Sequence, residues 1–94
     1  MKEKTLRIVW TEYIRYRAAL RGFDLAVVEH IVRYSSERYL DHVTGSFIAV
    51  GPHGKIQVMI AYETENDVLT PITVHATTRA QINARLQSGR FSHE

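Results

Sequence analysis

The side chains of this 94-residue chain that could do chemistry are five histidines and twelve cations, nine of which are arginines. The chain has no cysteine, so thiolate chemistry and disulfide bonds are excluded. The histidines occur at none of the spacings that metal ligands take, so we expect no metal and no cofactor. The sequence has no glycine-rich phosphate loop, and without a Gly-x-Ser-x-Gly motif acyl transfer has no support.

Histidine and arginine together suit the cleavage of RNA without a metal. One group takes the proton of the 2′-hydroxyl, an acid protonates the 5′-oxygen, and arginine stabilises the charge on the pentacovalent phosphate. A histidine titrates near pH 6.5, so it can serve as acid or base at cellular pH.

The candidate proton-transfer residue is His75, at the end of a strand that we predict over residues 68–75. Apolar residues alternate along the preceding strand, residues 55–63, and predict which face of the sheet packs against helices. His75 falls on the other face, which also receives Lys55, and the hairpin should bring His75 opposite residues 55–57. A strand histidine whose ring bonds a neighbouring carbonyl is the alternative interpretation of His75.

His42 and Glu63 are the candidate companions of His75 in catalysis. Glu63 lies beside the turn of the hairpin, roughly 20 Å from His75 along the strand at ~3.3 Å per residue. We therefore expect His42, or an arginine, to be the direct companion.

Three arginines near the C-terminal end supply cations for this site. On a helical wheel of residues 79–88, Arg79 and Arg85 flank the core stripe, and Arg90 lies roughly above Arg79. We predict that Arg79 belongs to the catalytic set, because the N–H groups of the first helical turn favour an anion. Lys55, Arg85 and Arg90 are predicted to bind RNA. The alternative is that these arginines cover the edge of the core and pair with acidic side chains.

Cap and turn residues divide the sequence into short elements. Thr11 and Asp24 are N-cap residues, and Gly22 and Gly89 stand where helices end. Pro71 cannot donate to a sheet ladder, so its strand should start at an edge or carry a bulge there. The predicted strands cover residues 6–10, 37–43, 46–51, 55–63 and 68–75, and the predicted helices lie within residues 11–23, 25–34 and 79–88.

These elements predict a single α+β domain, residues 1–94, with two N-terminal helices, an antiparallel meander sheet of four to five strands and a C-terminal helix. Helices should cover one sheet face, and part of the other face should stay open or be covered by a partner. The apolar fraction of 45% and the charged fraction of 23% are those of an ordinary globular protein. No run approaches ~18 consecutive apolar residues, and a small domain without cysteine fits a reducing compartment. We therefore expect a cytoplasmic protein with no membrane association.

Three segments carry a resemblance to known proteins: RAALRGFD, ERYLDHVTGSFIAVG and TPITVHATTRAQINARLQSGRF. With the element order above, they resemble the BrnT-like toxins and a related family of small uncharacterised bacterial domains, both of the RelE/ParE superfold. The shared features are an Arg-Gly-apolar turn between two helices and an Ile/Val-rich strand that runs into a helix opening with arginine. The resemblance implies the toxin of a type II toxin–antitoxin system, an endoribonuclease that acts on mRNA and is held in check by a cognate antitoxin.

The chain departs from these families at positions that matter for catalysis. ITVHATTR stands where BrnT-type strands read Arg-Ile-Ile-Ser-Ala-Arg, and Trp10 or Thr11 stands where the uncharacterised relatives carry a histidine. The catalytic residues of these families therefore do not carry over. Because a fold does not fix a function, two hypotheses stand. The chain is either a ribonuclease toxin or a non-catalytic protein- or RNA-binding module that uses the same face.

Aromatic residues near the N-terminus suggest a contact surface. The meander should have an edge strand, and Trp10, Tyr13 and Tyr16 should lie near the surface beside an apolar groove. We interpret these aromatics and Tyr34 as core and groove packing rather than as a platform for bases. We expect either a homodimer or a complex in which a helix or strand of a partner fills the groove.

Overall fold

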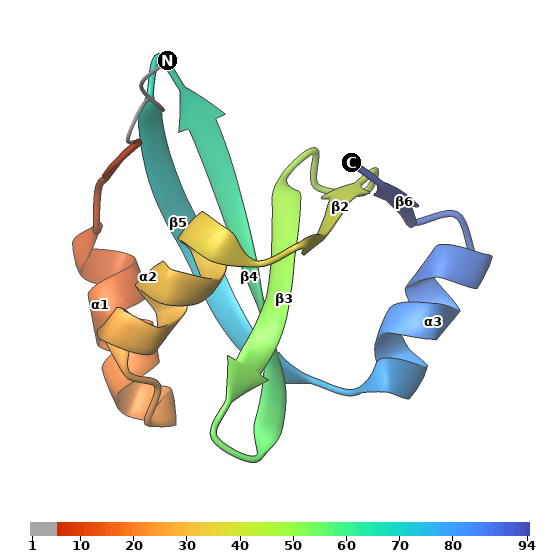
Figure 1. Ribbon diagram of the computed structural model, residues 1–94, viewed down its shortest axis with the longest axis horizontal. Helices are drawn as coiled ribbons and strands as arrows, with labels where there is room; N and C mark the ends of the chain where they lie inside the picture. The colour runs from red at the N-terminus through yellow and green to blue at the C-terminus, as the bar shows by residue number, and fades with distance from the viewer. Residues whose placement is uncertain (1–5) are drawn as a thin grey trace.

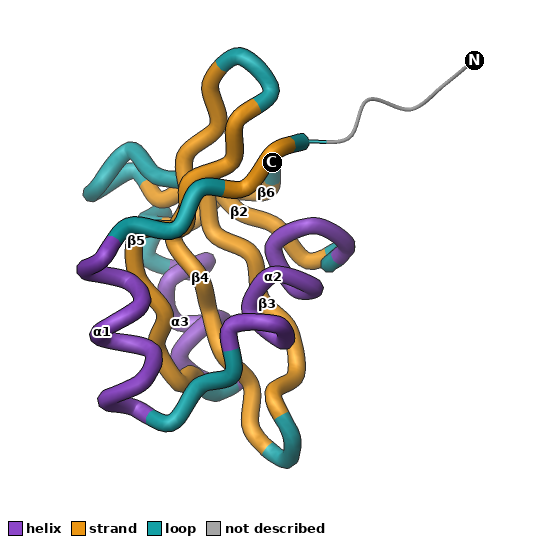
Figure 2. The backbone as a smooth tube through the Cα atoms, turned by 90° about the vertical axis from the view of Figure 1, so that its left-hand side faces the viewer, coloured by secondary structure: helices purple, strands orange, loops and turns teal. Residues whose placement is uncertain are grey.

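The computed structural model describes residues 6–94, in which six strands form one mixed sheet flanked by three helices (Figure 1 and Figure 2). The strand order is β1-β5-β4-β3-β2-β6, and all neighbours are antiparallel except β1 and β5. The predicted α+β class, with two N-terminal helices, a largely antiparallel sheet and a C-terminal helix, is confirmed. The elements are β1 (Arg7–Ile8), α1 (Glu12–Arg21), α2 (Leu25–Tyr34), β2 (Glu37–Asp41), β3 (Phe47–His53), β4 (Ile56–Glu65), β5 (Val68–Thr77), α3 (Arg79–Gln87) and β6 (Phe91–His93).

Local caps fix the two N-terminal helices where the sequence predicts them. The Thr11 hydroxyl accepts the N–H of Ile14 at 3.2 Å, and the Asp24 carboxylate accepts the N–H of Ala26 at 2.8 Å. Gly22 ends α1 in the left-handed conformation, with a φ of 76°.

The main core lies between α1, α2 and one face of the sheet. Helix α2 approaches β3 closely at Gly51, because a Cβ there would lie 2.9 Å from side-chain carbons of Ile31, and Ile31 or the backbone would have to shift. The buried side chains of this core come from both helices and from the strands β3, β4 and β5: Ile14, Ala18, Val28, Ile31, Val32, Ala49, Val58, Ile60, Tyr62, Leu69 and Val74.

Helix α3 packs on the opposite face of the sheet. Its Ile82 is fully buried in a cluster with Ile48 and Val50, whereas Ala49 between them faces the main core. The sequence predicts helices over one face and a second face that is partly open or covered by a partner; in the structure α3 covers part of that second face. Because α3 is joined to β6, which pairs with β2, it covers the β2–β3 end of the second face and leaves β5 partly exposed.

Strand β5 carries the bulge that Pro71 predicts. Pro71 pairs with Tyr62 and Thr73 pairs with Ala61, so Ile72 has no partner in the ladder of β4. The bulge shifts the alternation of side chains. As a result Leu69 packs into the same core as Val74, although a regular strand would place the two on opposite faces.

Strand β6 is an element that sequence patterns did not predict. It pairs with β2 through Tyr39 and His93, Leu40 and Ser92, and Asp41 and Phe91.

No helix within residues 6–94 is long and apolar enough to span a membrane.

Candidate functional site

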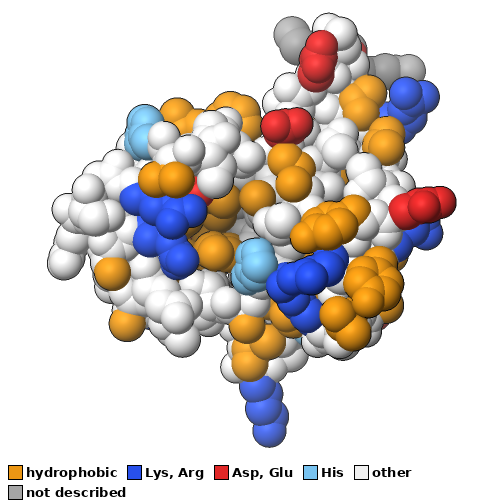
Figure 3. Space-filling model, turned by 180° about the vertical axis from the view of Figure 1, so that it is seen from behind, with side chains coloured by type: hydrophobic (Ala, Val, Ile, Leu, Met, Phe, Trp, Pro, Cys, Tyr) orange, Lys and Arg blue, Asp and Glu red, His pale blue; other side chains and the backbone are white. Residues whose placement is uncertain are grey.

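The second sheet face holds a hollow of about 320 Å³ between the sheet and the C-terminal segment. Figure 3 shows this side of the molecule, with a histidine near the middle and basic side chains on both sides of it. Apolar side chains of β3, β4 and β5 make the floor, while His75 and an Asp–Arg pair contribute to the rim. The lining residues are Asp41, Thr44, Ser46, Ile48, Met59, Ala61, Ile72, Thr73, His75 and Arg90.

His75 lies on this face, as the sequence predicts, but it pairs with Met59 rather than with residues 55–57. Its ring is half-buried, and Nδ1 lies 3.1 Å from Nη1 of Arg21. The same guanidinium nitrogen donates to the carbonyl oxygen of Val74 at 2.7 Å. A guanidinium can only donate, so Nδ1 of His75 accepts this bond, and the proton of the neutral ring is on Nε2.

Burial and three cations lower the pKa of His75 below its usual value. Burial is the largest cause, followed by the charges of Arg21, Arg17 and Arg85. Because the ordinary pKa of histidine is near 6.5, the ring of the free protein is neutral at pH 7.

The three arginines around His75 come from helices on opposite faces of the sheet. Arg17 and Arg21 belong to α1, and Arg85 belongs to α3, where its guanidinium lies 5.6 Å from the ring centre of Phe91. In the described part of the chain, ion pairs involve Arg33, Arg79 and Arg90, and none involves the three that surround His75. Nε of Arg17 is buried and has no hydrogen-bond partner among the described residues. Unpaired cations around a neutral ring make a site suited to an anion.

Arg79 points away from this site. It forms a bidentate ion pair with Glu37, which also accepts a hydrogen bond from the Tyr39 hydroxyl. The bond from Arg79 is the largest cause that lowers the pKa of Glu37. Arg79 is not among the charges that shift the pKa of His75.

Arg90 lines the hollow, but its charge is balanced. Its Nε and Nη2 donate to the two carboxylate oxygens of Asp41, each at 3.0 Å, and Asp41 is 3% exposed. Burial acts to raise the pKa of Asp41, yet the bonds from Arg90 and from the N–H of Val43 outweigh it, and the pKa is lowered. The alternative interpretation of arginines paired with acidic groups therefore describes both Arg79 and Arg90.

The structure does not bring His42 or Lys55 to the hollow. His42 is exposed, and its Nε2 lies 2.8 Å from Oγ of Ser92. Lys55 is exposed in the turn between β3 and β4. Glu63 pairs with Thr70 at the far end of the hairpin and lines a different hollow. Of the predicted site residues, His75, Arg85 and Arg90 are thus the ones that share this part of the molecule.

Arg17 and Arg21 are the site residues that sequence reasoning missed. A signal for them exists in α1, because a wheel at 100° per residue places both beside the buried stripe of Ile14 and Ala18. Residues in that position lie at the boundary between helix and sheet, where a long side chain can reach around the sheet edge.

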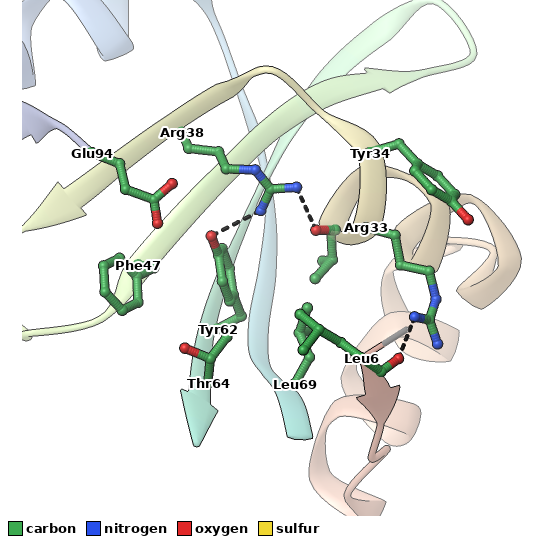
Figure 4. Close-up of a pocket in the computed structure, with 10 residues that line it drawn as sticks. Leu6, Arg33, Tyr34, Arg38, Phe47, Tyr62, Thr64, Leu69 and Glu94 are labelled. Atoms are coloured by element: carbon green, nitrogen blue, oxygen red, sulfur yellow. Dashed lines mark hydrogen bonds between the residues drawn. The ribbon is translucent and has the colours of Figure 1, made fainter. Parts of the chain in front are cut away.

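A larger hollow of about 490 Å³ lies on the other face, beside the end of α2 (Figure 4). The Arg38 guanidinium at its wall donates to the carbonyl oxygens of Val32 and Ser35 and to the Tyr62 hydroxyl, at 2.6, 2.8 and 2.8 Å. Arg38 therefore ties the connection from α2 to β2 onto the sheet. Its donors serve the fold.

Within residues 6–94 no three His, Asp or Glu side chains gather as metal ligands would. A search of family models, curated proteins and solved structures finds no match to this chain. Two helices followed by a mainly antiparallel sheet are an arrangement compatible with a RelE/ParE-like fold.

Proposed function

We propose that this chain is a RelE/ParE-like toxin of a type II toxin–antitoxin pair, a metal-independent endoribonuclease that binds mRNA across the hollow and cleaves it at His75. The observation that carries the proposal is the contact of Arg21 with a half-buried histidine on a partly open sheet face, where the charges of Arg17 and Arg85 also lower the pKa of that histidine. A cognate antitoxin would arrest this activity by covering the same face.

In the proposed reaction, binding of a phosphate changes the electrostatic surroundings of His75 and so its pKa. A phosphate diester between the arginines offsets their positive charge, so the pKa of His75 rises towards its usual value. When the Arg21 guanidinium turns to the phosphate, Nδ1 is freed to take the proton of the 2′-hydroxyl. The arginines then stabilise the charge of the pentacovalent phosphate. The 2′-oxygen bonds to phosphorus as the bond between phosphorus and the 5′-oxygen breaks, and the leaving 5′-oxygen takes a proton from water, which recovers one from the protonated ring of His75. The products are a 2′,3′-cyclic phosphate end, which water can hydrolyse to a 3′-phosphate, and a 5′-hydroxyl end.

A second candidate function is a non-catalytic module that binds RNA or protein through the same face. The observation in its favour is that Nδ1 of His75 is occupied by Arg21 and Nε2 carries the proton. In this state the ring can only donate a hydrogen bond, from Nε2. An anion-binding site needs such a donor, whereas a general base needs a free acceptor nitrogen.

The test is cleavage of a defined RNA by the purified protein, with His75→Gln as the variant and His30→Gln as the matched control. His30 is an exposed histidine of α2 that contacts Tyr34. We expect His75→Gln to lose about 10²–10⁴-fold in rate, His30→Gln to keep full activity, and EDTA to have no effect. Full activity of His75→Gln, or loss with EDTA, would contradict the ribonuclease proposal. If the wild-type protein binds the RNA but does not cleave it, the second candidate function, a non-catalytic binding module, is supported instead.

A further inference from the structure

Helix α1 carries a stripe of exposed large apolar side chains. Tyr13 is 55% exposed, Tyr16 is 64% exposed and Leu20 is 63% exposed. The interpretation of Tyr13 and Tyr16 as core packing was therefore wrong. Single exposed apolar residues are ordinary on a protein surface. These three recur at intervals of three and four residues, so they lie together on one side of the helix.

The stripe continues the basic site around His75. At 100° per residue, Arg21, Arg17, Tyr13, Leu20 and Tyr16 follow one another around α1 from the edge of the core outwards. The first two are the residues whose charges act on His75, and the Arg17 guanidinium lies 5.7 Å from the ring centre of Tyr13. Figure 3 shows hydrophobic side chains beside basic ones and a histidine on this side of the molecule.

We propose that Tyr13 and Tyr16 form a stacking surface for the unpaired bases of single-stranded RNA whose backbone lies against Arg17 and Arg21. The inference rests on the proposed function and specifies its substrate class. Aromatic rings next to cations suit a single strand, because exposed bases stack on the rings while phosphates meet the guanidinium groups. In a duplex the bases are stacked inside and cannot reach tyrosines on a helix surface.

The charge of α1 favours RNA over a second copy of the chain as the occupant. The helix holds Arg15, Arg17 and Arg21 against the single acid Glu12. Two such basic helices would repel each other in a symmetric contact, whereas a polyanion gains from each cation that it neutralises.

The experiment measures binding of a short single-stranded 2′-O-methyl RNA, which cannot be cleaved, by fluorescence anisotropy. The variants are Tyr13→Leu and Tyr16→Leu, which keep an apolar side chain and lose the ring. Tyr34→Leu is the matched control, because Tyr34 is 71% exposed on α2. We expect Kd to rise by roughly 5- to 150-fold for each stacked ring that is lost. The dependence of Kd on salt should stay unchanged, because no phosphate contact is removed.

An oligonucleotide with abasic sites completes the test. The wild-type protein should bind the abasic strand as weakly as the double variant Tyr13→Leu/Tyr16→Leu binds the full strand, and the double variant should lose nothing further on the abasic strand. Equal Kd values for wild-type and variant proteins on the full strand would overturn the stacking inference and leave the proposed function intact. Loss of self-association with unchanged RNA affinity would overturn it too and assign the stripe to a protein contact. A wild-type protein that binds no RNA would overturn both proposals.

Discussion

The ion pair between Asp41 and Arg90 allows a sharp test of how this fold is held together. Asp41 is almost fully buried, and both of its oxygens accept hydrogen bonds from Arg90, whose side chain is 37% exposed. The Asp41 carboxylate also accepts the N–H of Val43 at 2.9 Å and so shapes the turn that leads into β3. The perturbation is Arg90→Met, which keeps an apolar stem and removes the charge.

The expected loss follows from the burial of the acid. Removing one partner of a buried pair costs about 3–5 kcal/mol, since the other charge is left uncompensated. Water reaches Arg90, so we take a lower range of about 2–4 kcal/mol for Arg90→Met. Domains of this size lose roughly 4–8 °C in Tm per kcal/mol, which gives a drop of roughly 10–30 °C. Adding Asp41→Asn should restore most of the loss, because the amide is neutral and its oxygen can still accept from Val43.

The assay is urea and thermal unfolding of the two single variants and the double variant, evaluated as a double-mutant cycle. Arg79→Met is the matched control, because Arg79 is exposed and water reaches Glu37 more than it reaches Asp41, so the Tm of this variant should stay within a few degrees. If Arg90→Met and Arg79→Met unfold alike, or if Asp41→Asn restores nothing, then Asp41 is not a buried charge that depends on Arg90.

Three further predictions concern the site, the stability of the fold at acid pH and the core. Arg21→Gln should raise the pKa of His75, measured by NMR titration of the ring, and an unchanged or lower pKa would contradict the contact. The pKa of Asp41 is lower in the folded protein, so its carboxylate stabilises the fold above the unfolded pKa of about 3.9, and this stabilisation is lost as the pH falls through the folded pKa. The free energy of unfolding, measured as the pH is lowered through this range, should therefore fall more steeply for the wild-type protein than for Asp41→Asn. Gly51→Ala should lower the urea midpoint, since its Cβ would lie 2.9 Å from Ile31, and an unchanged midpoint would show that Ile31 moves aside freely.

Elements fixed by neighbouring residues could be predicted from the sequence. Thr11 and Asp24 bond N–H groups two or three residues further along, so the helices that they cap follow from short segments. Strand β6 could not be predicted in this way. Its three residues are extended because they pair with β2, about fifty residues earlier in the chain, as Phe91 does with Asp41.

The bulge in β5 could be predicted from a single residue, but its effect on the rest of the strand could not. Pro71 predicts an irregularity, and the structure has one at that point. The sequence does not tell how the strand continues beyond it. A single unpaired residue reverses the alternation, and Leu69 therefore faces the core rather than the open face.

The site was predictable only where strand alternation decides. His75 lies on the second sheet face as expected, because the alternation is regular on its side of the bulge. The partners of the arginines depend on contacts far apart in the chain. Arg79 bonds Glu37 across 42 residues and Arg90 bonds Asp41 across 49, and spacing along the sequence says nothing of either pair.

The position of Arg21 joins the stability of the sheet to the site. Among residues 6–94, β1 pairs with β5 only at Val68 and Leu69, so no described strand lies beside the rest of that edge of β5. Arg21 reaches this edge from α1 and donates to the carbonyl oxygen of Val74, which protects an edge that could otherwise pair with another chain. The same nitrogen contacts His75. Under the proposed function, a phosphate that draws Arg21 away would therefore expose the edge and free the ring in one movement. The proposed binding of RNA would thus work against a contact of the fold. Arg17 bonds no edge carbonyl in the described residues, so it is the cation that would hold a phosphate without this cost.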